Sequence, residues 1–89
     1  MTLEEIKIYE SEMKRLKVST VARSARGFLT AYKRAGGDPN KLSDAWKIKR
    51  TNFIKRHLVQ LREMPTYRRW LALIAWSFYP GKLKSHVNI

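Results

Sequence analysis

Apolar side chains recur at intervals of three and four residues along most of this chain, a spacing typical of amphipathic helices. The first such segment follows Thr2, which with Glu5 three residues later matches a capping box. We therefore expect a first helix over residues 3–17. Its apolar positions are Leu3, Ile6, Tyr9, Met13 and Leu16.

The second segment is expected at residues 21–34. The β-branched cluster at residues 18–21 weakens helix propensity, and either Ser19 or Ser24 is placed to cap the helix that follows. This helix should end at Gly36 and Gly37, because glycine adopts a positive φ at little cost.

Two longer helices are predicted in the second half. Ser43 is expected to cap a helix that ends near Glu63, and Thr66 is expected to cap another that continues to about Phe78. Apolar residues nearly encircle the axis of this last helix, which predicts that it is central to the core. Pro80 and Gly81 should stop it.

The pattern predicts an all-α fold, a compact bundle of about four helices with a Gly-Gly-Asp-Pro loop between the second and third. No stretch shows the alternation of a strand. We divide the chain into an acidic leading helix at 1–17, a basic helical core domain at 18–81 and a C-terminal tail at 82–89. Eighty-nine residues without cysteine form one small domain that is stabilised by packing rather than by disulfides.

The net charge of the chain and its uneven distribution add the most to the helical pattern. The chain contains 19 Lys and Arg against 7 Asp and Glu, a formal net charge of +12. Residues 1–12 carry −3 and residues 13–89 carry +15. The leading helix is expected to be solvated or to pair with the basic body, and the body is expected to bind an anionic partner.

The second predicted helix supplies the first candidate site. At about 100° per residue, its four basic residues fall within one arc, opposite the apolar side. Such an arc suits a helix that follows phosphates. These residues are Arg23, Arg26, Lys33 and Arg34, and the further candidates are Lys55, Arg56, Arg68 and Arg69. Gly27, expected inside this helix, should allow a neighbouring helix or a phosphate to approach the backbone.

Arg50 and His57 are unusual because both fall on the apolar side of the third predicted helix. One interpretation is a shared site for a phosphate or carboxylate, with two donors from Arg50 and a third from His57. The other is a polar pair in the core, in which Arg50 bonds Asp38 or Asp44 and His57 bonds a backbone carbonyl. The sequence leaves both open.

The sequence does not favour an enzyme. Two His, no Cys and few acids outside the first helix leave no nucleophile–base pair, carboxylate dyad or metal-ligand spacing. We expect no catalytic residue, no metal, no cofactor and no small-molecule substrate. The Gly36-Gly37 loop also lacks the flanking residues of a phosphate-cradling loop.

Several short motifs of residues 21–80 resemble a recurring module of small basic phage-encoded proteins and phage polyprotein segments of uncharacterised function. They are Ala22-Arg23-Ser24, the segment 27–32 with Gly36-Gly37, Lys49-Arg50 with Phe53-Ile54 and Arg56-His57, and Arg68-Arg69 with the segment 71–76. The resemblance implies a viral setting: a place in the virion, on packaged DNA, or on a host or capsid component.

These observations predict a phosphate-directed nucleic-acid-binding protein, with DNA favoured over RNA. The alternatives are a virion structural or host-interaction protein that docks on an acidic protein surface, and a membrane-active cationic helical protein. A membrane partner is the less favoured. The first residues lack the pattern of a secretory signal peptide, so we expect the host cytoplasm or the virion as the location.

Overall fold

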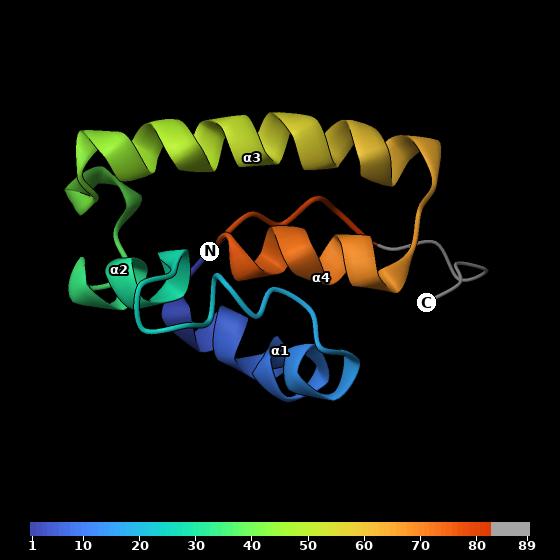
Figure 1. The fold of residues 1–89 in the computed structure, drawn as a ribbon, viewed down its shortest axis with the longest axis horizontal. Helices are drawn as coiled ribbons and strands as arrows, with labels where there is room; N and C mark the ends of the chain where they lie inside the picture. Colours follow the sequence, from blue (N-terminus) through green and yellow to red (C-terminus); the bar gives the residue numbers. More distant parts are fainter. Residues whose placement is uncertain (83–89) are drawn as a thin grey trace.

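The computed structural model describes residues 1–82 and shows four α-helices and one short 3₁₀ helix (Figure 1). No strand occurs in this part of the chain, so the predicted all-α fold is confirmed. Most of the predicted tail, residues 83–89, lies outside the described residues. The elements are α1 (Leu3–Leu16), α2 (Phe28–Arg34), η1 (Pro39–Lys41), α3 (Asp44–Glu63) and α4 (Tyr67–Ala75).

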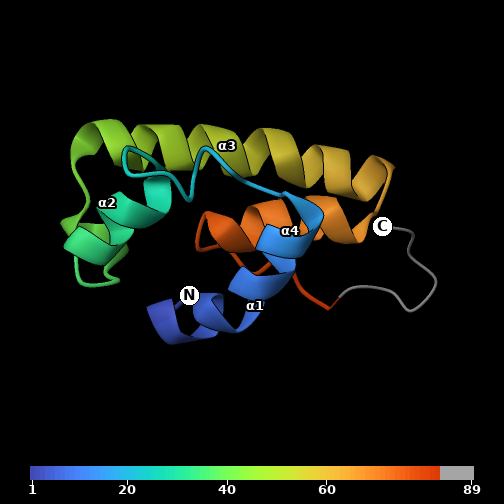
Figure 2. The ribbon, with the colours of Figure 1, turned by 60° about the horizontal axis from the view of Figure 1, so that its bottom comes forward.

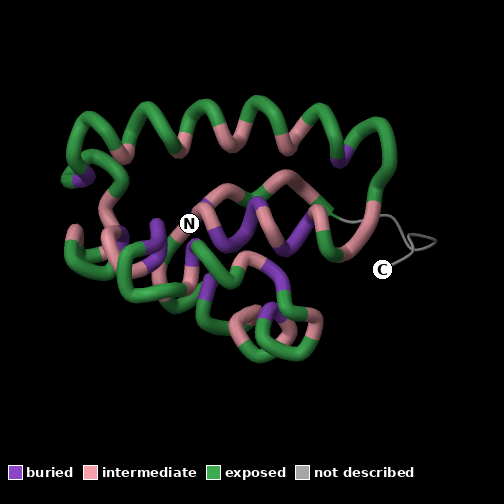
Figure 3. Tube along the Cα trace, viewed as in Figure 1, coloured by how far each residue is buried: buried purple, intermediate pink, exposed green. Residues whose placement is uncertain are grey.

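Helix α4 occupies the middle of the molecule, as its all-round apolar pattern predicts. Helix α3 runs along one long edge beside it, and α1 packs on the opposite side (Figures 1 and 2). Leu71, Leu73 and Ile74 are completely buried, and Figure 3 shows buried segments along α4 as well as in α1 and α2. Ile6 and Met13 bring α1 into the same core.

Three of the predicted N-caps are present. Thr2 and Glu5 form both hydrogen bonds of the capping box, the Ser43 hydroxyl accepts from the Trp46 N–H, and the Thr66 hydroxyl accepts from the Arg69 N–H. These side chains satisfy N–H groups that have no partner within the helix. The starts of α1, α3 and α4 therefore follow from local sequence.

The prediction for the second helix is wrong at its start. Helix α2 begins at Phe28, and residues 19–26 form a series of turns instead. Ser19 has a positive φ of 56°, and neither Ser19 nor Ser24 is the cap. The turns bury Val18 and Ala22 and leave Val21 80% exposed, so tertiary packing overrides the helical pattern of this segment.

Gly27 explains how these turns fit against α2. It is the N-cap residue of α2 rather than an interior residue, and a Cβ at this position would lie 2.0 Å from the Val21 carbonyl oxygen. The backbone that approaches it is thus the preceding turn, not another helix. Leu29 N–H then bonds the Ala22 carbonyl at 2.9 Å, which joins the turn to the start of α2.

Helix α4 ends three residues earlier than predicted. Ser77 adopts the left-handed conformation with φ 61°, and the Phe78 N–H bonds the Leu73 carbonyl at 3.0 Å, as in a Schellman motif. Serine is an uncommon residue for this conformation. Ser77 is 1% exposed, and its hydroxyl donates to the Met1 carbonyl at 3.0 Å, so the surrounding core holds it there.

A stack of five rings joins three of the helices. Successive ring centroids lie 5.4, 4.7, 4.4 and 3.8 Å apart, with interplanar angles of 14–21°. Because it passes from α2 through the end of α4 to α3, this ring stack fixes the three elements relative to one another. Its members, in order, are Tyr32, Phe28, Trp76, Phe53 and His57.

The turn before α2 generates a stability prediction. Gly27→Ala should lower the free energy of unfolding by about 2–3 kcal/mol, because backbone atoms must move to admit the new methyl group. Gly36→Ala is the matched control: it has open space but a φ of +69°, so it should cost only about 1–2 kcal/mol. Urea unfolding of the two variants measures the difference, and a cost for Gly27→Ala no larger than the control would contradict the close approach.

Candidate nucleic-acid interface

Arg50 bonds neither Asp38 nor Asp44 in the structure. Its Nε donates to the Trp76 carbonyl at 2.9 Å, and one Nη donates to the Ser77 carbonyl at 2.7 Å. These carbonyls end α4, where a helix has unpaired acceptors and the negative end of its dipole. Arg50 is therefore a half-buried C-cap of α4, supplied by α3.

His57 lies apart from these Arg50 donors. Its ring stacks on Phe53 at 3.8 Å, and two helical turns, about 10 Å along the axis, separate it from Arg50. Burial lowers the pKa of His57 from its usual 6.5, and the charges of Arg56 and Arg69 lower it further. Arg56 and Arg69 are thus the cations whose charge acts on His57.

Three other predicted phosphate ligands bond main-chain carbonyls at helix ends. Arg23 donates to Val18 at 3.1 Å just after α1, Arg68 donates to Leu16 at the end of α1, and Arg69 donates to Met64 at 2.8 Å at the end of α3. We call these three and Arg50 the capping arginines. Arginine has five N–H donors, so each retains donors for an external anion.

The positions of Arg68 and Arg69 in the chain look unfavourable at first. Both residues open α4, where their charge opposes the α4 dipole. In the structure both side chains reach the C-terminal ends of neighbouring helices, where a cation is favourable. Their place in the first turn of α4 therefore has a structural reason.

The predicted basic arc on the second helix does not form as one helical face. Arg23 and Arg26 precede α2, and only Lys33 and Arg34 lie within it. Lys33 also pairs with Glu10 of α1 at 3.6 Å. Arg26 and Arg34 are exposed.

Helix α3 presents the most extended group of exposed basic side chains. It is 20 residues long, and five Lys and Arg residues along it are exposed. Lys55 and Arg56 are among the predicted ligands, and Lys47, Lys49 and Arg62 are not. We call these five residues the α3 cationic surface. The sequence does contain a signal for all five residues. In a helix as long as α3, the apolar side determines which residues face outward, and the five basic residues lie outside that side.

Acidic side chains leave this surface unneutralised. Residues 17–82 contain fifteen Lys and Arg but three Asp and Glu, a net charge of +12. Within residues 1–82 the two ion pairs are Arg15 with Glu12 and Lys33 with Glu10, and both acids belong to α1. The acidic α1 thus pairs in part with the basic body, while the α3 cationic surface has no carboxylate partner among the described residues.

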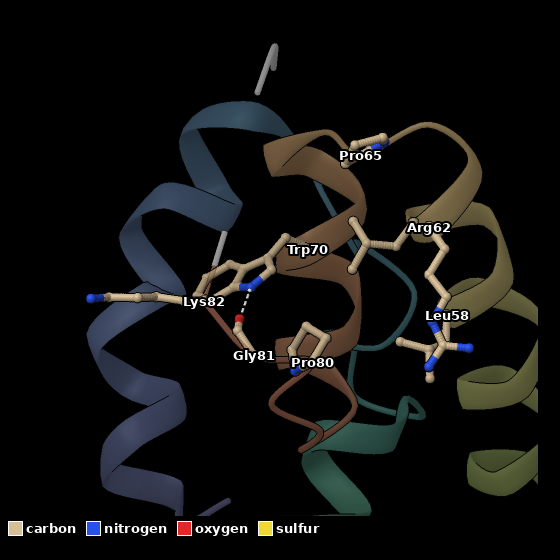
Figure 4. Close-up of a pocket in the computed structure, with 8 residues that line it drawn as sticks. Leu58, Arg62, Pro65, Trp70, Pro80, Gly81 and Lys82 are labelled. Atoms are coloured by element: carbon tan, nitrogen blue, oxygen red, sulfur yellow. Dashed lines mark hydrogen bonds between the residues drawn. The ribbon is translucent and has the colours of Figure 1, made fainter. Parts of the chain in front are cut away.

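A hollow of about 280 Å³ lies where α3 and α4 meet the segment after α4 (Figure 4). Leu58, Leu61 and Trp70 line its apolar part, and the Trp70 indole N–H donates to the Gly81 carbonyl at 2.8 Å. Arg62 and Lys82 are its charged lining residues. The hollow has no group of converging acids and bases, and no three metal-ligating side chains cluster anywhere in residues 1–82.

Comparisons with protein-family models, curated proteins and solved structures find no match to this chain. The phage-module resemblance therefore stays a prediction. No helix within the described residues is both long enough and apolar enough to cross a membrane. The apolar side chains Leu71, Leu73 and Ile74 are in the core, so the membrane-active alternative would require α4 to leave it.

The C-cap role of Arg50 gives a direct test. Arg50→Met should lower the free energy of unfolding by about 2–3 kcal/mol, because two charge-assisted hydrogen bonds to the end of α4 are lost and the Ser77 carbonyl keeps only the longer bond from the Met1 ammonium, at 3.4 Å. Lys55→Met, on the exposed side of the same helix, should change it by less than about 0.5 kcal/mol. Thermal unfolding measures both, and equal stabilities would contradict the capping role.

His57 should make stability depend on pH. Because its folded-state pKa lies below the unfolded value of 6.5, its neutral form is favoured by folding, and this contribution is lost as pH falls through the folded pKa. His57→Phe keeps an aromatic ring for stacking but removes the titration. Urea unfolding at pH 7.5 and 5.5 should show a larger loss for the wild type than for the variant; equal losses would contradict the assigned shift.

Proposed function

We propose that this protein is a non-enzymatic nucleic-acid-binding protein that contacts phosphates mainly through the α3 cationic surface, with DNA as the favoured ligand. The observation that carries the proposal is five exposed cations on one 20-residue helix with no carboxylate partner among the described residues. Neutralising phosphates with such side chains releases condensed counterions, which makes binding favourable at low salt.

The dimensions of α3 support this function. Lys47 and Arg62 are fifteen residues apart, which is about 22 Å along the helix axis. Duplex DNA carries about one phosphate charge per 1.7 Å of its axis, so several phosphates lie within reach of this span. Arg26, Arg34 and the donors that the capping arginines retain would add weaker contacts around it.

The cluster of Arg56, His57 and Arg69 supports an anion contact at one side of α3. Its charges already disfavour protonation of His57, and a bound phosphate would reverse that effect. Arg69 is held by its bond to the Met64 carbonyl, which reduces the conformational entropy lost on binding. We therefore include all three residues in the proposed interface.

Docking on an acidic protein surface is the second candidate, and one observation favours it. Ile48, Val59 and Met64 are large apolar side chains that are more than half exposed. Methionine and arginine are enriched at protein interfaces, and Arg62 lies two residues before Met64. Binding of this kind should resist salt better than phosphate contacts do.

The test is fluorescence-anisotropy binding to labelled duplex DNA, single-stranded DNA and RNA between about 50 and 200 mM salt. The double variant Lys49→Gln/Arg56→Gln should weaken duplex binding about tenfold or more and reduce the salt slope by about 2. Lys7→Gln/Lys14→Gln is the control, because it removes the same charge from exposed positions of α1.

Two results would contradict the proposal. Equal losses for the two double variants would mean that net charge alone, rather than the α3 cationic surface, determines binding. Absence of binding by the wild type at the lowest salt would exclude the nucleic-acid function and leave docking on an acidic protein as the candidate to test.

A further inference from the structure

Along the outward side of α3, the residue types at the centre differ from those at the two edges. Ile48, Asn52, Lys55 and Val59 follow one another at spacings of four, three and four residues, so they form one strip along the helix. Ile48 is 62% exposed and Val59 is 51% exposed. Asn52 is also exposed, and its side chain makes no hydrogen bond to another described residue. We call these four residues the central strip.

Cations flank the central strip on both sides. At about 100° per residue, Lys47 and Arg62 lie about 50–110° to one side of its centre, and Lys49 and Arg56 lie about 70–90° to the other. Contacts to phosphates alone would not require two large apolar residues and an amide between the two rows of cations. The arrangement instead has two charged edges and a centre able to make apolar contacts and hydrogen bonds.

We infer that α3 enters the major groove of duplex DNA, with the central strip on base edges and the flanking cations on the phosphates of the two groove walls. This inference rests on the proposed function and adds sequence preference to it. A major groove about 12 Å wide and 8.5 Å deep admits a helix about 10–12 Å in diameter. The phosphates on its two sides match the two cationic edges.

The chemistry of the central strip specifies the preferred bases. An asparagine amide forms two hydrogen bonds with N6 and N7 of adenine, and apolar side chains contact the C5-methyl group of thymine. Asn52 lies between Ile48 and Val59 along α3. The preferred site should therefore contain A·T base pairs, with an adenine facing Asn52 and thymine methyl groups facing the two apolar residues. Lysine bonds O6 and N7 of guanine, so a guanine is expected opposite Lys55.

The fold leaves this side of α3 accessible. The other elements lie on one side of α3, and its outer half is exposed along the whole helix (Figures 1 and 3). Entry of α3 into the groove thus needs no rearrangement of the described core.

The central strip also distinguishes duplex DNA from other ligands. The major groove of A-form RNA is too narrow and deep for side chains to read. A second copy of this chain packed on the same strip would bring the cationic edges of two helices together, which like-charge repulsion opposes. An acidic helix is chemically compatible with the strip, and the experiment below separates it from DNA.

The experiment is selection of binding sites from a random duplex library, with wild type, Asn52→Ala and Lys49→Gln/Arg56→Gln compared in parallel. The wild type should enrich a motif with A·T pairs. Asn52→Ala should lose discrimination at one adenine by about 5- to 150-fold while its affinity for random duplex at low salt stays within about twofold. The double variant should weaken binding to all duplexes and keep the same motif.

Replacement of thymine by uracil in the selected site tests the apolar contacts, because it removes only the major-groove methyl group. It should weaken wild-type binding several-fold and have a smaller effect on an Ile48→Ala/Val59→Ala variant. Both substituted residues are more than half exposed, so the variant should retain its fold, which circular dichroism verifies.

The outcomes separate the inference from the proposed function. Salt-dependent duplex binding without an enriched motif, or a motif unchanged by Asn52→Ala, would overturn the groove inference and leave phosphate-directed binding in place. No binding to any nucleic acid would overturn both. In that case, weakened binding of the Ile48→Ala/Val59→Ala variant to a synthetic acidic amphipathic helix would assign the central strip to a protein partner.

Discussion

The fold depends on the two hydrogen bonds that Arg50 donates to the C-terminal end of α4. They hold the carbonyls of Trp76 and Ser77 at a turn where Ser77 is buried and in the left-handed conformation. This turn sets the position of the Trp76 ring, which lies between Phe28 of α2 and Phe53 of α3. One guanidinium thus connects the central helix to the ring stack and leaves the opposite side of α3 facing solvent.

The same use of arginine recurs at other helix ends and explains how a chain of net charge +12 folds with few acids. Arg23, Arg68 and Arg69 each donate to a carbonyl at or just after the end of α1 or α3. Helix dipoles and unpaired carbonyls take the place of carboxylates as partners for these cations. The five residues of the α3 cationic surface do not have this role, and they remain open to an external anion.

Local signals predict part of this structure and tertiary contacts decide the rest. The starts of α1, α3 and α4 follow from Thr2, Ser43 and Thr66, since each cap accepts from the N–H three residues ahead. The start of α2 is not predictable this way, because burial of Val18 and Ala22 and the close approach at Gly27 come from packing. For the same reason, the sequence identifies Arg50 as unusual but not its carbonyl partners, which lie 26 and 27 residues away.

The central claim is that the outward side of α3 contacts nucleic acid while Arg50 holds α4 inside the fold. Titration of the isotope-labelled protein with a short DNA duplex, followed by amide chemical shifts, tests it most directly. The account predicts that the largest shifts fall between Lys47 and Arg62 and that the amides around Trp76 and Ser77 move little. Shifts centred on α1, or the absence of any shift at low salt, would contradict it.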